Sequence, residues 1–290
     1  MNRRDLLKNT LMGAFALTLR PGLAWAATAD QATTQFTALE RKHGGRLGVS
    51  ILDTQSGHRI QHRAGERFLM CSTFKWLAAA AVLARVDSGK ERLDRRVVYG
   101  KDVLLSYAPI TSKHVGAPGL SVADLCAAAV TLSDNTAANL LLASLGGPTA
   151  ITAFARSLGD ETTRLDRIEP ELNLGRPGDI RDTTTPDAML SDLHRVLLGD
   201  RLSLASRGLL LQWLRECTTG LDALRAGLPK EWTAGDKTGS GSQGETNDVA
   251  IIWPPQRKPL LVTAYYAGSR AEPAERKAVL AAVGHIAASM

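Results

Sequence analysis

Hydrophobic and polar positions form strand-like patterns near the start and near the end of the chain. Residues 46–65 show an apolar run, a turn at 54–57 and an alternating return, which is the pattern of a β-hairpin. Three later runs are rich in the Val, Ile, Tyr, Trp and Thr that favour strands: "EWTAGDKTGSG", "NDVAIIWPP" and "PLLVTAYYAG". We therefore predict one five-stranded antiparallel sheet, built from two early strands and three late ones.

Helical periodicity dominates the remainder. It runs through residues 72–217, and amphipathic segments at 30–45 and 271–290 predict a helix at each end of the chain. The pattern predicts an α/β (α+β) fold in which helices flank the sheet and a second lobe is all-helical. We expect residues 28–65 and 218–290 to form the α/β lobe and residues 66–217 the helical lobe. An active site is expected at the seam between them.

Residues 1–27 have the features of an export signal. Arg3 and Arg4 precede an uncharged, mostly apolar run and the small-residue site "AWAA". The apolar run is too short to serve as a permanent membrane anchor. We predict a twin-arginine signal peptide over residues 1–27 and a mature protein in the bacterial periplasm.

Composition and charge narrow the function classes. The 290 residues are 44% hydrophobic and 22% charged, as in ordinary globular proteins. Half of the formal net charge of +6 lies in residues 1–26, and no long basic run or zinc-finger spacing follows, so we do not expect nucleic-acid binding. Cys71, Cys126 and Cys217 fit no metal site and are expected to be buried thiols. The scattered histidines complete no ligand set, and we expect no metal, no cofactor and a monomer.

The stretch "MCSTFKWLAAAAVL" places Ser72 and Lys75 at the start of an alanine-rich helix that we expect to end near Gly89. Residues three apart share a helix face, so the two side chains should touch. A serine needs a base before it becomes a nucleophile, and a lysine with a depressed pKa is one. Taken alone, the pair is more typical of a helix cap with a solvated lysine than of a catalytic pair.

Three further motifs change this interpretation: "LSDN" at 132–135, "DRIEPELN" at 166–173 and "KTGSG" at 237–241. Each alone is typical of a turn, an acidic loop or a strand end. In this order, together with Ser72 and Lys75, the chain resembles the class A serine β-lactamases of the penicillin-binding family. The resemblance extends from about residue 32 to the C-terminal helix, and the family's fold agrees with the two lobes predicted above.

The resemblance implies a role for each motif. The catalytic residues are Ser72, Lys75, Ser133 and Glu169, with Ser72 as the nucleophile and Ser133 relaying a proton to the departing lactam nitrogen. Whether Lys75 or Glu169 is the acylation base stays open. The backbone N–H groups of Ser72 and Ser240 form the implied oxyanion hole. The implied substrate-binding residues are Tyr107, Asn135, Asn173, Lys237, Thr238 and Ser240.

The implied activity is hydrolysis of the β-lactam amide of penicillins and cephalosporins, which confers resistance, with these small molecules as the partners. Glu169 and Asn173 would hold the deacylating water, Arg167 and Asp182 would close the base of their loop, and Glu169–Pro170 would be a cis peptide. The alternatives are a D-alanyl-D-alanine peptidase and a non-hydrolysing β-lactam sensor. The presence of Glu169 favours the hydrolase.

Two departures from the family pattern leave details open. Thr246 stands where many members have an arginine that assists the substrate carboxylate, and the candidates to replace it are Arg225, Arg276 and Lys277. Some carbapenem-hydrolysing members pair a cysteine at the position of Cys71 with one where this chain has Gly241. We expect no disulfide at Cys71, and the substrate spectrum stays undetermined.

Overall fold

The computed structural model describes residues 21–176 and 178–290, with side chains from residue 28 onward. The predicted signal peptide lies outside the described residues except for residues 21–27. Those residues begin helix α1 (Pro21–His43), which therefore starts earlier than the expected residue 30.

A five-stranded antiparallel sheet forms the centre of the α/β part and confirms the predicted fold class. Its spatial order is β2-β1-β9-β8-β7. The early hairpin therefore joins the late strands through β1 and β9, which pair along their whole length. The strands are β1 (Arg46–Asp53), β2 (Arg59–His62), β7 (Thr233–Ser240), β8 (Thr246–Trp253) and β9 (Leu260–Ala267).

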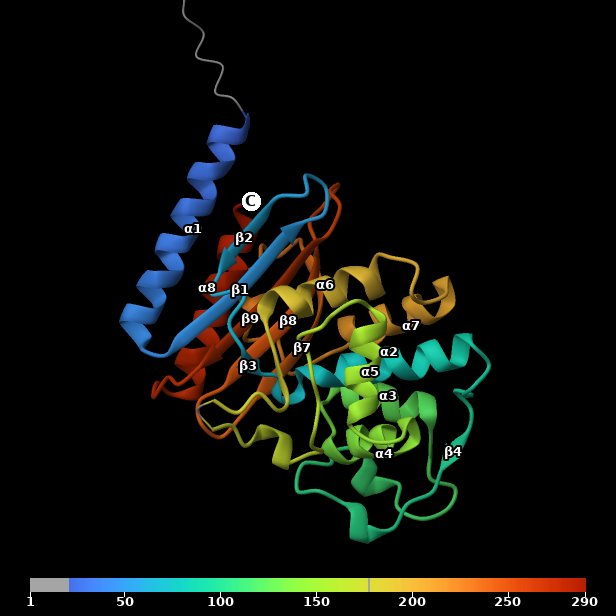
Figure 1. Cartoon of the computed structure of the whole chain (residues 1–290). Coiled ribbons are helices and arrows are strands. Elements are labelled where there is room, and N and C mark those ends of the chain that lie inside the picture. The colour runs from blue at the N-terminus through green and yellow to red at the C-terminus, as the bar shows by residue number, and fades with distance from the viewer. Residues whose placement is uncertain (1–20, 177) are drawn as a thin grey trace, which may run out of the picture.

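Each face of this sheet packs against helices, because successive side chains of a strand point to opposite faces. In β8, Ala250 and Ile252 join the core under α1 and α8 (Pro273–Ala288). Val249 and Ile251 join the larger core on the other side. Figure 1 shows the two terminal helices together on one side of the sheet and the remaining helices on the other.

The larger core surrounds α2 (Phe74–Asp87), which is buried from Phe74 to Leu83. The small alanine side chains of α2 let neighbouring helices approach closely. Gly89 beyond its end has φ of 68°, in the left-handed conformation expected there. The predicted capping box at Ser121 and Asp124 is also present. The helices packed around α2 are α3 (Val122–Thr131), α4 (Asn135–Leu145), α5 (Thr149–Ser157), α6 (Pro186–Leu197) and α7 (Leu204–Arg215).

Four two-residue strands lie among these helices, and the helical pattern did not predict them. They form the pairs β3 (Phe68–Leu69) with β6 (Thr183–Thr184) and β4 (Arg96–Val97) with β5 (Leu120–Ser121). Two residues are too few to show a period, so such strands depend on a distant partner. The β3–β6 pair ties the segment before Ser72 to the end of the loop that carries Glu169.

Short 3₁₀ turns complete the chain. They are η1 (Cys71–Thr73), η2 (Lys101–Val103), η3 (Thr111–Lys113), η4 (Glu171–Asn173) and η5 (Leu224–Gly227). All three cysteines are free and buried, as predicted.

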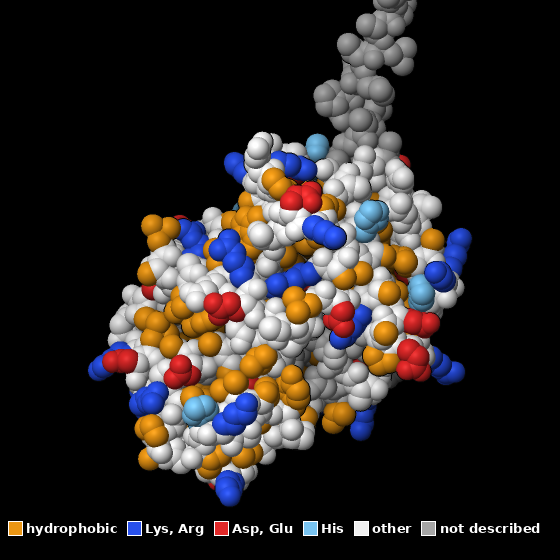
Figure 2. Space-filling view, turned by 180° about the vertical axis from the view of Figure 1, so that it is seen from behind, with side chains coloured by type: hydrophobic (Ala, Val, Ile, Leu, Met, Phe, Trp, Pro, Cys, Tyr) orange, Lys and Arg blue, Asp and Glu red, His pale blue; other side chains and the backbone are white. Residues whose placement is uncertain are grey.

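On the face shown in Figure 2, Lys and Arg side chains are interspersed with Asp and Glu. Within the described part of the chain, no single helix is long and apolar enough to cross a membrane. Only the sharply bent pair α4–α5 meets that test when its helices are taken together.

Candidate active site

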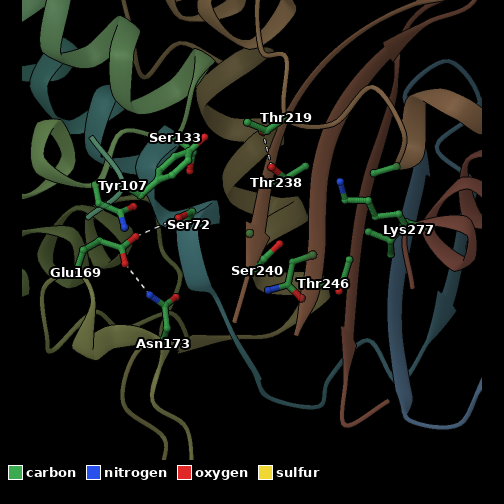
Figure 3. Close-up of a pocket in the computed structure, with 15 residues that line it drawn as sticks. Ser72, Tyr107, Ser133, Glu169, Asn173, Thr219, Thr238, Ser240, Thr246 and Lys277 are labelled. Atoms are coloured by element: carbon green, nitrogen blue, oxygen red, sulfur yellow. Dashed lines mark hydrogen bonds between the residues drawn. The ribbon is translucent and has the colours of Figure 1, made fainter. Parts of the chain in front are cut away.

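A cleft of about 330 Å³ lies where β7 faces η1 and the helices. Figure 3 shows side chains from distant parts of the sequence pointing into it. The predicted site residues that line it are Ser72, Tyr107, Ser133, Asn135, Glu169, Asn173, Thr238 and Ser240.

Ser72 lies in η1, directly before α2, and its Oγ donates to Glu169 Oε1 at 3.0 Å. The preceding residue, Cys71, has φ of 45°, a strained value for a side-chain-bearing residue of the kind that gathers at functional sites. Gly239 of β7 packs against the same turn. A Cβ at Gly239 would lie 3.1 Å from Ser72 N and 2.7 Å from Met70 O, so a glycine is needed for this approach.

Lys75 is fully buried on the first turn of α2. Its Nζ donates to Ser133 O at 2.8 Å and to Asn135 Oδ1 at 2.5 Å, and it lies 3.0 Å from Glu169 Oε1. Burial lowers the pKa of Lys75 to about 8, the charge of Lys237 adds to this, and Glu169 opposes it. Ser72 and Lys75 thus meet through one carboxylate oxygen, and the described side chains show no direct hydrogen bond between them.

Ser133 lies between two lysines. Its Oγ accepts from Lys75 Nζ at 3.3 Å and from Lys237 Nζ at 3.1 Å. Burial also lowers the pKa of Lys237. A hydroxyl that accepts twice has its own proton left to donate, and Ser133 faces the cleft. Its φ of 59° is a second strained value at a predicted catalytic position.

The carboxylate of Glu169 is buried and oriented by amides. Asn173 Nδ2 donates to Oε2 at 2.6 Å, and Asn139 binds the Glu169 backbone on both sides, donating to O at 2.8 Å and accepting from N at 2.9 Å. The Glu169–Pro170 peptide bond is cis, as the resemblance implied. Asn139 belongs to none of the predicted motifs. Its signal was its position four residues after Asn135, which puts both amides on one face of α4.

The base of this loop is closed by an ion pair. Arg167 Nε donates to Asp182 Oδ2 at 2.5 Å. The other carboxylate oxygen, Oδ1, accepts from the backbone N–H groups of Asp166 and Arg167 at 2.7 and 2.9 Å. Asp182 is fully buried, so its charge depends on these donors.

The opposite wall of the cleft is β7, with Lys237, Thr238 and Ser240. Thr238 Oγ1 lies 2.5 Å from the hydroxyl of Thr219, a residue outside the predicted motifs. Ser240 pairs across the strands with Thr246. The hydroxyl of Thr246 accepts from Arg276 Nε at 3.0 Å.

The three candidate cations for this wall differ in position. Arg276 contacts Thr246, as described above. Arg225 forms an ion pair with Asp236 and donates to Leu214 O at 2.9 Å, on the side of β7 that packs on α7. Lys277 lines the far end of the cleft and pairs with Asp222 Oδ2 at 2.7 Å. Arg276 is therefore the candidate that contacts the residue opposite Ser240.

Cys71 faces Gly241. A Cβ at Gly241 would lie 3.2 Å from Cys71 Sγ, but glycine offers no sulfur there. Among the described residues, no group of three or more His, Cys, Asp and Glu is arranged to hold a metal ion.

These contacts define a class of enzyme. The Ser72 hydroxyl is hydrogen-bonded to a buried carboxylate, and a buried lysine and a second serine lie beside it. Such a hydroxyl can lose its proton to the carboxylate and become acylated, and water can then hydrolyse the ester. This is the arrangement of a serine hydrolase that works through an acyl-enzyme.

Comparisons with known proteins place the chain more closely. A model of the β-lactamase enzyme family matches residues 31–289. β-Lactamase Toho-1 of Escherichia coli is 50% identical over 98% of this chain and 96% of its own length. β-Lactamase OXY-2 of Klebsiella oxytoca is 47% identical over 95% of this chain and 94% of its own length. A solved ancestral class A β-lactamase is 60% identical, with a TM-score of 0.88 over 89% of this chain and 99% of that chain. The chain therefore belongs to the β-lactamase enzyme family, and its relatives place it in class A.

Proposed function

We propose that this β-lactamase hydrolyses penicillins and cephalosporins through an acyl-enzyme on Ser72. The observation that carries the proposal is the position of Glu169. Its buried carboxylate is hydrogen-bonded to Ser72 Oγ through one oxygen and held by Asn173 through the other. One carboxylate is thus positioned to serve both the attack of the serine and the later attack of a water molecule.

In acylation, Ser72 Oγ attacks the lactam carbonyl as its proton leaves. Of the two candidate bases, Glu169 is favoured because it receives the Ser72 hydrogen bond, while Lys75 donates elsewhere. Before this transfer, the buried charge of Lys75 stabilises the Glu169 carboxylate, and its hydrogen bond to Ser133 Oγ orients that hydroxyl. Ser133 donates its proton to the lactam nitrogen as the C–N bond breaks. Lys75, 3.3 Å from Ser133 Oγ, gives Ser133 a new proton and takes the one that Glu169 received from Ser72, so Glu169 is ionised again before deacylation.

The substrate carboxylate would bind along β7, to Lys237, Thr238 and Ser240. Arg276 supports this wall through Thr246 and adds positive charge in the place of the missing strand arginine. Backbone N–H groups of Ser72 and Ser240 would bind the carbonyl oxygen, and each such donor is typically worth about 3 kcal/mol in the transition state. Asn135 and Tyr107 at the opposite wall would contact the acylamino side chain.

In deacylation, Glu169 takes a proton from a water oriented by Asn173, and the water attacks the ester. The water oxygen bonds to the acyl carbon, the ester C–O bond breaks, and the proton returns to Ser72. The ion pair of Arg167 with Asp182 keeps the loop in place during this step.

Replacing Glu169 with glutamine tests the proposal, because an amide has the same shape and cannot accept the proton. The Glu169→Gln variant should accumulate a penicilloyl adduct on Ser72, visible by intact-protein mass spectrometry, while the parent turns over. Ser72→Ala is the matched control and should form no adduct. Turnover of the variant at the parent's rate would sink the assignment of Glu169.

The same experiment distinguishes the alternatives. A D-alanyl-D-alanine peptidase or a non-hydrolysing sensor would hold the adduct in the parent as well as in the variant.

We also propose that the chain forms two lobes, residues 28–65 with 218–290 and residues 66–217, and that the cleft lies between them. We further propose that the protein acts as a monomer in the periplasm after twin-arginine export, without a stable membrane anchor and without nucleic-acid binding.

A further inference from the structure

A short segment that follows α7, residues 217–220, reaches the cleft beside β7. Cys217 is 1% exposed, and its Sγ lies 3.2 Å from Thr219 Oγ1. Thr219 Oγ1 in turn lies 2.5 Å from Thr238 Oγ1. Both threonines line the cleft, and Figure 3 shows the hydrogen bond that joins their side chains. A thiol and two hydroxyls therefore form a chain that ends at the wall where the substrate carboxylate would bind.

The backbone of this segment is fixed at both ends of Thr219. Thr218 N donates to Thr131 O at 3.1 Å. On the other side, Gly220 packs directly on the carboxylate of Asp236, so that any Cβ at this position would collide with it. Thr219 consequently cannot move away from Thr238 without breaking these contacts. In the hydrogen bonds that Thr219 forms with Cys217 and Thr238, either partner can be the donor.

That direction matters because each hydroxyl has a single proton. A substrate carboxylate only accepts hydrogen bonds. If Thr238 donates to it, then Thr219 must donate to Thr238, and Thr219 has its own lone pairs left for the thiol proton. We propose that Cys217 is a positioning residue that donates to Thr219 and thereby holds the Thr238 proton toward the substrate carboxylate. This inference rests on the proposed function.

The competing acceptor for the thiol proton is Asp236. Its Oδ1 is bound to Arg225, and its Oδ2 has no hydrogen-bond partner among the described residues. Donation to Asp236 would affect the stability of β7 without selecting the direction of the threonine hydroxyls. The two arrangements differ in one respect that can be measured, namely whether the effect of Cys217 depends on a negatively charged substrate carboxylate.

The experiment compares acylation by benzylpenicillin with acylation by its methyl ester, which lacks the charged carboxylate. In Cys217→Ala, we expect kcat/KM for the free acid to fall about threefold to tenfold, the range that one hydrogen bond supplies. The loss should appear in KM more than in kcat. The rate with the ester should stay within about twofold of the parent.

Three further variants separate positioning from packing. Cys217→Ser keeps a donor and should restore the acid-to-ester preference. Cys126→Ala removes another buried thiol, in α3, and should leave the preference unchanged. Thr219→Val should reproduce the selective loss, and adding Cys217→Ala to it should cost nothing more, because the thiol acts through Thr219.

Equal losses for acid and ester, or no loss at all, would overturn the inference. So would additive losses in the double variant or a failure of Cys217→Ser to restore the preference. If Cys217→Ala does not fold, Cys217→Val, which fills the same space without a donor, takes its place with the same expected losses. A parent that opens neither the acid nor any other β-lactam would instead overturn the proposed function, and this outcome does not depend on Cys217.

Discussion

Replacing Asp192 with asparagine should stabilise this protein at neutral pH. Asp192 lies on α6, is fully buried, and has no hydrogen-bond partner for either carboxylate oxygen among the described residues. Its neighbour is the buried carboxyl group of Asp160, whose Oδ1 accepts from Thr162 N and Thr163 N while Oδ2 has no partner. Two ionised carboxylates would supply no donor here, whereas one proton between them supplies it.

The magnitude follows from the pKa. Burial raises the pKa of Asp192 from its usual 3.8 to about 9, Asp160 adds to the rise, and Arg195 and Arg156 oppose it. The raised pKa means that the folded protein keeps the proton which the unfolded chain loses above pH 4. The contribution of Asp192 to the stability is therefore greatest below pH 4 and falls by about 1.4 kcal/mol per pH unit as the pH rises toward 9. At pH 7 the upper limit of this loss is about 4 kcal/mol.

Asparagine does not ionise, and its amide can donate to Asp160 Oδ2. We expect Asp192→Asn to be about 2 to 4 kcal/mol more stable than the parent at pH 7 and to lose that advantage near pH 4. Urea unfolding at pH 4, 5.5, 7 and 8, followed by tryptophan fluorescence, measures this difference. Asp200→Asn, at an exposed acid, is the matched control and should change little at any of these pH values.

A stability difference between Asp192→Asn and the parent that is the same at every pH would contradict this prediction. The prediction would also be contradicted if Asp192→Asn is less stable than the parent at pH 7 while the slope of its unfolding free energy against urea concentration is unchanged. Either result would mean that Asp192 is charged in the folded protein and is compensated by Arg195 or Arg156.

Three other changes have expected outcomes. Asp182→Asn weakens a buried ion pair and should cost about 2 kcal/mol of stability. Hydrogen exchange across residues 166–182 should be faster and penicillin hydrolysis slower, and unchanged exchange and rates would contradict this prediction. Gly239→Ala puts a Cβ 2.7 Å from Met70 O and 3.1 Å from Ser72 N, so β7 must shift. Acylation should slow by about tenfold or more in a stopped-flow assay. Acylation at the parent's rate would show that the strand has room for the methyl group. Replacing Arg3 and Arg4 with lysines should leave the precursor in the cytoplasm, as fractionation and blotting would show, whereas a normal periplasmic yield would indicate another export route.

The sequence by itself determined the architecture, because local pattern and burial agree along most of the chain. An apolar run predicted the strand that became β1, and runs rich in Val, Ile, Tyr, Trp and Thr predicted β8 and β9. The odd and even residues of these strands join different cores. Local chemistry also located helix ends, as at Gly89 and at the capping box of Ser121, since these depend on residues only a few positions apart. The order of four short motifs indicated the family before any contact between them was known.

Only the tertiary structure decided how the site residues meet. The hydrogen bond of Ser72 to Glu169 joins residues 97 positions apart, and the clamp of Asn139 on Glu169 joins residues 30 apart. No local preference encodes such pairs, because they depend on how β7, η1 and the loop at 166–182 pack together. The same holds for Arg276 beside Thr246, and for the thiol of Cys217 behind Thr219, which the sequence showed only as a scattered cysteine. Packing fixes these contacts because a buried polar group must find a partner wherever the fold brings one.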